Sequence, residues 1–168
     1  NMIQADYDND GDVDILVLRG AWLREFGRHP NSLLQNDGHA RFRDVTFDAG
    51  LGENHYPTQS AAWGDYDIDG DLDLYIANEI GDSELFENDG RGHFTNVALK
   101  AGVTGGHYPK GVVWGDYDND RYPDLYVSNL KGPNQLYHNN QDGTFTDVAS
   151  EAGVVEPDRS FPTWFWDF

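Results

Sequence analysis

Residues 65–73 read Asp65-Tyr66-Asp67-Ile68-Asp69-Gly70-Asp71-Leu72-Asp73, with an acid at every second position and a glycine near the middle. The pattern returns 51 residues later as Asp116-Tyr117-Asp118-Asn119-Asp120-Arg121-Tyr122-Pro123-Asp124. It also stands 59 residues earlier as Asp6-Tyr7-Asp8-Asn9-Asp10-Gly11-Asp12-Val13-Asp14, the extra residues lying mainly between Arg19 and Pro30. Asp167-Phe168 follows Asp116 by another 51 residues and begins a fourth copy. A repeat of this length indicates a chain built from similar supersecondary units.

A second motif keeps the same phase in each repeat. Asn36-Asp37-Gly38, Asn88-Asp89-Gly90 and Asn139-Asn140-Gln141-Asp142-Gly143 each precede a Phe-x-x-Val segment. Asn, Asp and Gly tolerate positive φ, so these segments predict hairpin turns.

Within one repeat the pattern predicts four short strands and no long helix. In the second repeat they are expected at residues 60–66, 72–77, 84–87 and 94–98. Four strands at a period near 50 are typical of propeller blades. We therefore predict an all-β fold: a β-propeller fragment of about three four-stranded blades and the start of a fourth. The repeats are expected at about 1–59, 60–110 and 111–161, with the fourth from 162, and we expect them to be part of a longer chain.

The acidic loops have the composition of a calcium site. Calcium takes six to eight oxygen ligands at roughly 2.3–2.6 Å, and acids at positions 1, 3 and 5 of a tight loop can converge on one ion. Glycine at position 6 allows the turn, position 7 offers its main-chain carbonyl, and the acid at position 9 closes the shell. The predicted ligands of about three Ca²⁺ ions, one per loop, are Asp6, Asp8, Asp10, Asp12, Asp14, Asp65, Asp67, Asp69, Asp71, Asp73, Asp116, Asp118, Asp120, Tyr122 and Asp124.

The alternative is a solvated acidic turn, which is disfavoured because acids packed so closely repel each other unless a cation lies among them. An EF-hand is excluded because it needs Glu at position 12, where this chain has Val17, Ile76 and Val127. The third loop is expected to bind most weakly, since Arg121 replaces the Gly of the other two loops and adds a positive charge.

Composition narrows the class of protein. The chain has 30 Asp and Glu against 11 Lys and Arg, for a net charge of −19, which argues against nucleic-acid binding. Aromatic residues make up 14% of the chain, which argues against disorder. There are no cysteines, so thiolate metal sites are excluded. No stretch of 18 apolar residues is present, so we expect no membrane span in this segment.

These motifs resemble the FG-GAP/VCBS repeat family, whose propeller repeats also occur in integrin α subunits. The Trp-Gly-Asp-Tyr-Asp segments at Trp63 and Trp114, and Phe94-Thr95-Asn96-Val97-Ala98, are most similar to repeats of the ASPIC/UnbV type. The resemblance implies a calcium-stabilised, secreted or surface propeller used in adhesion or scaffolding. It does not imply integrin-like recognition, because the Gly-Ala-Pro sequence that gives the integrin-type repeat its name is absent. Its place is taken by Ala77-Asn78 and Ser128-Asn129.

Other residues have two interpretations each. Trp63 and Trp114 are expected in the blade core, with sugar stacking as the alternative. His55-Tyr56-Pro57 and His107-Tyr108-Pro109 occupy equivalent loops and are either packed loops or a second ligand site. The insertion contains Trp22, Arg24, Phe26 and Arg28, residue types that often anchor a partner.

Strand parity predicts where such a partner binds. The acidic loops and the hairpin turns should lie at one face, and the insertion and the His-Tyr-Pro loops at the other. We expect a non-enzymatic calcium-binding module in an extracellular, cell-surface or periplasmic location, acting in adhesion, scaffolding or surface assembly. Its partner would be a protein, a carbohydrate or further copies of the chain. The alternative is an ancillary propeller domain of a secreted enzyme whose catalytic residues lie outside this segment.

Overall fold

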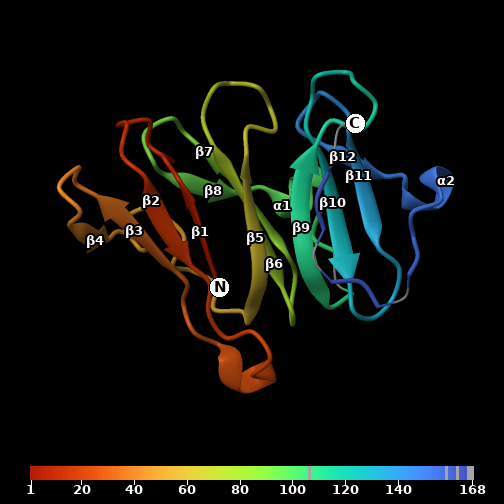
Figure 1. Ribbon diagram of the computed structural model, residues 1–168, viewed down its shortest axis with the longest axis horizontal. Helices are drawn as coiled ribbons and strands as arrows, with labels where there is room; N and C mark the ends of the chain where they lie inside the picture. The colour runs from red at the N-terminus through yellow and green to blue at the C-terminus, as the bar shows by residue number, and fades with distance from the viewer. Residues whose placement is uncertain (106, 158, 162, 166–168) are drawn as a thin grey trace.

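The computed structural model describes residues 1–105, 107–157, 159–161 and 163–165, and its strands form three antiparallel four-stranded sheets (Figure 1). The first sheet contains β1 (Met2–Ala5), β2 (Asp14–Val17), β3 (Ser32–Asn36) and β4 (Phe42–Asp44). The second contains β5 (Thr58–Gly64), β6 (Asp73–Asn78), β7 (Glu84–Asn88) and β8 (Phe94–Asn96). The third contains β9 (Pro109–Gly115), β10 (Asp124–Asn129), β11 (Gln135–Asn139) and β12 (Phe145–Asp147). This confirms the all-β propeller fragment of about three blades; the fourth copy expected at Asp167-Phe168 lies outside the described residues.

Each sheet follows chain order, so successive strands run up and down. The hairpin turns have the expected positive φ, as at Gly38 (73°) and Gly90 (72°). The turn between β7 and β8 is closed by the Asp89 N–H, which donates to the carbonyl of His93 at 3.0 Å. The turn motif therefore places β3, β7 and β11 beside the last strand of each blade.

The prediction that the fourth strand reaches Ala98 is wrong: the strand ends two residues earlier, and a helical turn follows it. Strand β8 ends at Asn96, and Ala98–Ala101 forms α1. The Asn96 side chain accepts a hydrogen bond from the Ala98 N–H at 3.1 Å, and Gly102 ends the turn with φ of 80°. The third blade repeats this arrangement with α2 (Ala149–Ala152). A third turn that sequence periodicity did not indicate is the 3-10 helix η1 (Arg24–Gly27) in the insertion.

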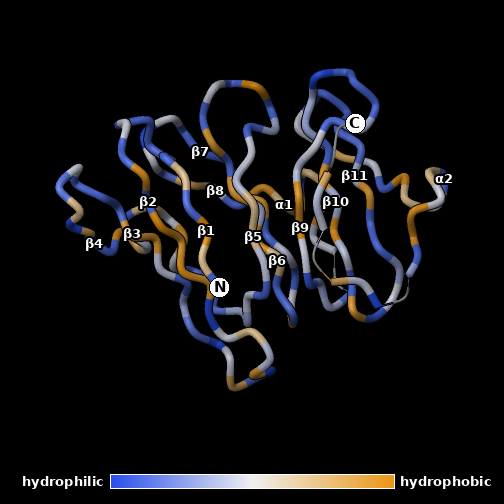
Figure 2. The backbone as a smooth tube through the Cα atoms, viewed as in Figure 1, coloured by the Kyte–Doolittle hydropathy of each residue, from blue (hydrophilic) through white to orange (hydrophobic). Residues whose placement is uncertain are grey.

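The hydrophobic core lies between the sheets, while the loop tips are mostly hydrophilic (Figure 2). Between the first and second blades, Tyr7 stacks on Trp63 with ring centroids 6.1 Å apart, and Phe94 packs against both rings. Between the second and third blades the same triad recurs as Tyr66, Trp114 and Phe145. The two tryptophans therefore belong to the blade core, as expected, and do not form an exposed sugar platform.

The two ends of the sheets carry different loops. The three acidic loops connect the first and second strands of each blade and lie together at the upper end in Figure 1. The insertion that contains η1 lies at the lower end. This confirms the predicted placement of the insertion opposite the acidic loops. None of the helices in the described ranges has both the length and the hydrophobicity that crossing a membrane would need.

Candidate metal centres

All three acidic loops are folded by the same hydrogen bonds. The first carboxylate accepts from the main-chain N–H groups of the fifth and sixth residues. In the second loop, Asp65 accepts from Asp69 and Gly70, both at 3.1 Å. The corresponding bonds in the other two loops are Asp10 and Gly11 to Asp6, and Asp120 and Arg121 to Asp116. The first acid therefore closes the loop.

Two positions in each loop have left-handed backbone conformation. The sixth position has φ of 92° at Gly11, 99° at Gly70 and 81° at Arg121. Glycine was expected to allow the turn at this position, and Arg121 adopts the same positive φ at a cost that glycine avoids. The fourth position, which we did not single out, also has positive φ: Asn9 at 57°, Ile68 at 61° and Asn119 at 63°. The asparagine at this position in two of the three loops could have indicated positive φ, because asparagine tolerates the left-handed region.

The ninth acid of each loop is buried at the start of the second strand. Asp14, Asp73 and Asp124 are all at most 1% exposed. In the second loop, Asp73 accepts from the Tyr66 N–H at 3.2 Å and from the Asn88 N–H at 2.9 Å. The first and third loops have the same pair of bonds to their ninth acids. These acids connect each loop to the third strand of its own blade.

The carboxylates converge in part as expected. Ligand atoms within 4.8 Å of one another come from four groups: Asp6, Asp8 and Asp10; Asp65, Asp67 and Asp73; Asp116, Asp118 and Asp124; and Asp118, Asp120 and His138. Asp14 and Asp69 are outside the groups of their loops. The main-chain carbonyls of Asp12, Asp71 and Tyr122 stay predicted ligands, since these groups concern side chains.

The electrostatics of the loops favour a cation. Burial, with a smaller contribution from neighbouring loop carboxylates, raises the pKa of Asp14 to about 6 and that of Asp73 to about 7, although main-chain N–H donors lower both. The Asp8 Oδ1 atom is shielded from solvent and has no hydrogen-bond partner. A hard dication between the carboxylates would satisfy such an oxygen and offset the repulsion. The donor set, which consists of carboxylates, therefore fits calcium.

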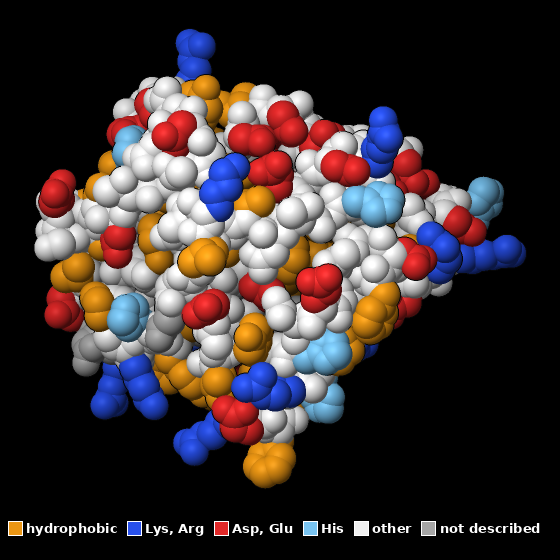
Figure 3. Space-filling view, turned by 180° about the vertical axis from the view of Figure 1, so that it is seen from behind, with side chains coloured by type: hydrophobic (Ala, Val, Ile, Leu, Met, Phe, Trp, Pro, Cys, Tyr) orange, Lys and Arg blue, Asp and Glu red, His pale blue; other side chains and the backbone are white. Residues whose placement is uncertain are grey.

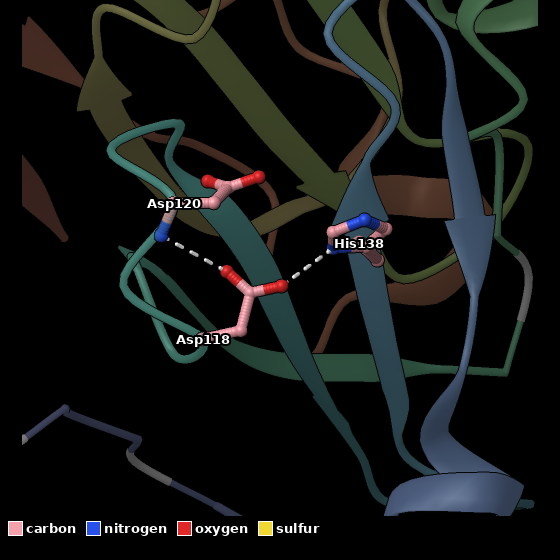
Figure 4. Close-up of side chains that lie close together, drawn as sticks. All are labelled: Asp118, Asp120 and His138. Atoms are coloured by element: carbon pink, nitrogen blue, oxygen red, sulfur yellow. Dashed lines mark hydrogen bonds and ion pairs between the residues drawn. The ribbon is translucent and has the colours of Figure 1, made fainter.

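One residue from the third strand of each blade also reaches its loop, and the sequence analysis did not identify it. It directly precedes the asparagine of the hairpin motif and is Gln35, Glu87 or His138. Gln35 Nε2 donates to Asp8 at 2.6 Å. Figure 4 shows His138 directed at Asp118, with 3.4 Å between His138 Nδ1 and Asp118 Oδ2. The constant phase with the turn motif was the signal that could have revealed this position.

At the end opposite the acidic loops, the insertion contacts the second and third blades. The Trp22 N–H donates to Glu79 at 2.7 Å, and Glu79 forms a fully buried ion pair with Lys110. The Lys110 ammonium lies 3.4 Å from the centre of the Trp22 ring and 4.4 Å from that of Tyr108. The sequence did not reveal this buried pair, because Glu and Lys usually lie at the surface.

The tip of the insertion is exposed: Phe26 is 88% and Leu23 52% accessible. Arg28 lies over the Tyr56 ring, 5.4 Å from its centre, so the insertion and a His-Tyr-Pro loop share this end. Figure 3 shows acidic side chains crowding the upper rim, the end that carries the acidic loops. Among the described residues, His55 and His107 join no cluster of three metal-binding side chains.

Comparison with known families agrees with this architecture. The FG-GAP-like repeat model matches three overlapping segments, residues 6–76, 67–127 and 116–166. Together they span most of the chain, and the chain belongs to the FG-GAP-like repeat family.

Three curated proteins similar to this chain are named cartilage acidic protein 1. The match to the human protein is 39% identical over 103 aligned residues and covers 52% of this chain and 15% of the human protein. The match to the mouse protein is 36% identical over 100 aligned residues and covers 52% of this chain and 16% of the mouse protein. The match to the Xenopus tropicalis protein is 35% identical over 116 aligned residues and covers 60% of this chain and 18% of that protein. The chain thus spans less than a fifth of these relatives.

Proposed function

We propose that these blades form a calcium-binding propeller module that presents a partner-binding face. The observation that carries the proposal is the triplicated loop, in which three side-chain carboxylates approach one another within 4.8 Å, with the buried ninth acid among them in the second and third loops. Asp14 and Asp73 have raised pKa values because burial disfavours their charge. A bound dication would stabilise the charged form of each of these carboxylates, so calcium should stabilise the native state by mass action.

Thermal unfolding with and without calcium tests this proposal. Excess chelator should lower the melting temperature, and calcium added beyond the chelator should restore it. At a calcium concentration of about 100 times the dissociation constant, one site adds about 2.7 kcal/mol. An unchanged melting curve in chelator, together with no calcium uptake by calorimetry, would contradict the proposal.

The module is further proposed to act outside the cytoplasm, in adhesion, scaffolding or surface assembly. Extracellular calcium modules bind at about 10⁻⁴–10⁻³ M, a range that is useful only where calcium is abundant. The name of the relatives, cartilage acidic protein 1, supports this setting. Nanomolar affinity for calcium, or a cytosolic location of the full protein, would argue against it.

The proposed partner-binding face is the end that carries the insertion. Phe26 is almost fully exposed, while the Trp22 N–H holds the segment in place by donating a hydrogen bond to Glu79. This arrangement is suited to a rigid protruding contact. Exchanging Phe26 for alanine should weaken binding to a protein or carbohydrate partner, or self-association, by about 1 kcal/mol or more. Phe42→Ala is the matched control, since Phe42 is 45% exposed on β4 and pairs with Asn36 beside the hairpin turn, at the end that carries the acidic loops. Equal effects of the two changes would refute the assignment.

We also propose that these blades have no catalytic role. Paired carboxylates can serve a glycosidase, but the carboxylates that cluster within the described ranges are those of the loops. In each loop the first and ninth acids accept main-chain N–H bonds that fold the loop. Screening the purified protein for glycoside hydrolysis tests this, and activity lost on changing a loop acid would overturn it.

A further inference from the structure

The three loops differ most at the residue that the third strand brings to them. The first blade offers an amide, Gln35, the second a carboxylate, Glu87, and the third an imidazole, His138. Gln35 makes a hydrogen bond to its loop. His138 Nδ1 lies 3.4 Å from Asp118 Oδ2 and 3.3 Å from Asp124 Oδ1, yet forms no hydrogen bond and is shielded from solvent.

The imidazole is held in this orientation by its surroundings. The Tyr117 ring meets the His138 ring edge-on, with centroids 6.0 Å apart and an angle of 74° between the planes. Ligand atoms of Asp118, Asp120 and His138 lie within 4.8 Å of one another, and Figure 4 shows Asp118 between the loop and the ring. Asp124 is fully buried beneath them. A single ion between these groups would satisfy the unpartnered nitrogen.

A nitrogen donor changes which ion such a site prefers. Calcium takes oxygen ligands, whereas imidazole suits zinc and other divalent transition metals. The third loop also carries Arg121 where the other two loops have glycine, with φ of 81°. We propose that the third loop binds a divalent transition-metal ion of the Zn²⁺ class through His138, Asp118 and Asp120. This rests on the proposed function in that the loops are taken to bind cations.

Titration of the purified protein with Zn²⁺ in saturating Ca²⁺ tests the inference. Wild type should bind one Zn²⁺, and His138→Gln should weaken that binding by about tenfold or more. Glutamine is chosen because Gln35 stands at the equivalent position in the first blade. The matched control is His93→Gln, an exposed histidine in the turn after β7, which should leave zinc binding unchanged. The reciprocal change Gln35→His should create a second zinc site.

Two further measurements make the outcome decisive. Co²⁺ in place of Zn²⁺ should give a visible absorption spectrum that His138→Gln alters. Calcium binding to the first and second loops, measured in the same variants, shows that they fold. Loss of zinc binding equally in both histidine variants, or zinc affinity untouched by His138→Gln, would overturn the inference. Binding of calcium at three equivalent sites, with no zinc binding, would overturn this inference but leave the proposed function intact. Binding of zinc without any calcium binding would support this inference but contradict the proposed function.

Discussion

The side chain of Asn88 donates a hydrogen bond to the carbonyl of Tyr7, 2.9 Å away and 81 residues distant in the chain. Tyr7 lies between two predicted metal ligands of the first loop. The same amide group donates to Leu72 at 3.1 Å, inside the second loop, and the Asn88 N–H binds Asp73. Asn88 therefore joins two neighbouring acidic loops. Asn139 repeats the arrangement one blade later, with bonds to Tyr66 and Pro123.

Replacing Asn88 with alanine should weaken cation binding in the first and second loops together. The change leaves two main-chain carbonyls without their donor, at a cost of about 1–3 kcal/mol for a buried group. Asn36→Ala is the control, because within the described part of the chain the Asn36 side chain donates to Val13 of its own loop and not to a neighbouring blade. Calcium calorimetry of both variants checks the expectation. A loss confined to the second loop in Asn88→Ala would show that the loops are independent.

The sixth loop position allows a reciprocal exchange. Arg121→Gly should raise calcium affinity at the third loop, because glycine adopts positive φ without the roughly 1 kcal/mol penalty of other residues. Gly70→Arg should lower affinity at the second loop for the same reason. A Cβ added at Gly70 meets no atom within 4 Å, so steric crowding does not explain a loss there. Calcium titrations that leave both sites unchanged would contradict the account.

Glu84 predicts a pH dependence away from the acidic loops. It is 6% exposed and accepts hydrogen bonds from Asn54, Asn78 and Asn96 at 2.6, 3.0 and 3.2 Å. Desolvation by burial raises its pKa, and the amide donors offset this only in part. The folded state therefore holds the Glu84 proton more tightly than the unfolded chain does. This contribution to stability is present at low pH and is lost as pH rises through the raised pKa.

Glu84→Gln should remove that part of the pH dependence. As pH rises above the usual pKa of glutamate, the free energy of unfolding of the variant should fall less than that of the wild type. Glutamine is tolerated at the equivalent position of the third blade, Gln135, which is also buried. Urea unfolding at several pH values in excess calcium measures the difference. Parallel curves for the two proteins would show that Glu84 does not titrate in this range.

Trp22 should stabilise the folded insertion, although its side chain is partly exposed. Trp22→Ala removes the ring that covers Lys110 and should destabilise the protein by about 1–2 kcal/mol, since about half of the ring is buried. It should also increase proteolytic cleavage within residues 20–30. Phe26→Ala, at the exposed tip of the same segment, should change stability by less than about 0.5 kcal/mol. Equal protease sensitivity of the two variants would mean that Trp22 is not the anchor.

The blade architecture could be predicted because its signals are local. Alternating apolar residues mark the strands, and the acids, Gly and Asn mark the loops at constant spacing. The positive φ at Arg121 followed from the equivalence of Gly11 and Gly70 alone. The helical turn at Ala98–Ala101 was missed because four residues are too few for a helical period to appear.

The remaining site residues depend on register and packing across strands. His138 approaches Asp118 because β10 and β11 pair antiparallel, which brings together residues 20 apart. The buried Lys110–Glu79 pair needs the second blade, the third blade and the insertion to meet. A one-residue shift in strand pairing would move such side chains to the other face of the sheet. Those contacts therefore could not be predicted from the sequence.

The Arg19–Pro30 insertion also breaks the equivalence of the blades. Three nearly identical blades would offer a partner three nearly identical docking positions, related by rotation about a common axis. The insertion belongs to the first blade, where it adds residues that the spacing of the next two copies does not contain. A partner that recognises Phe26 would therefore meet these three blades in one rotational setting and with one-to-one stoichiometry.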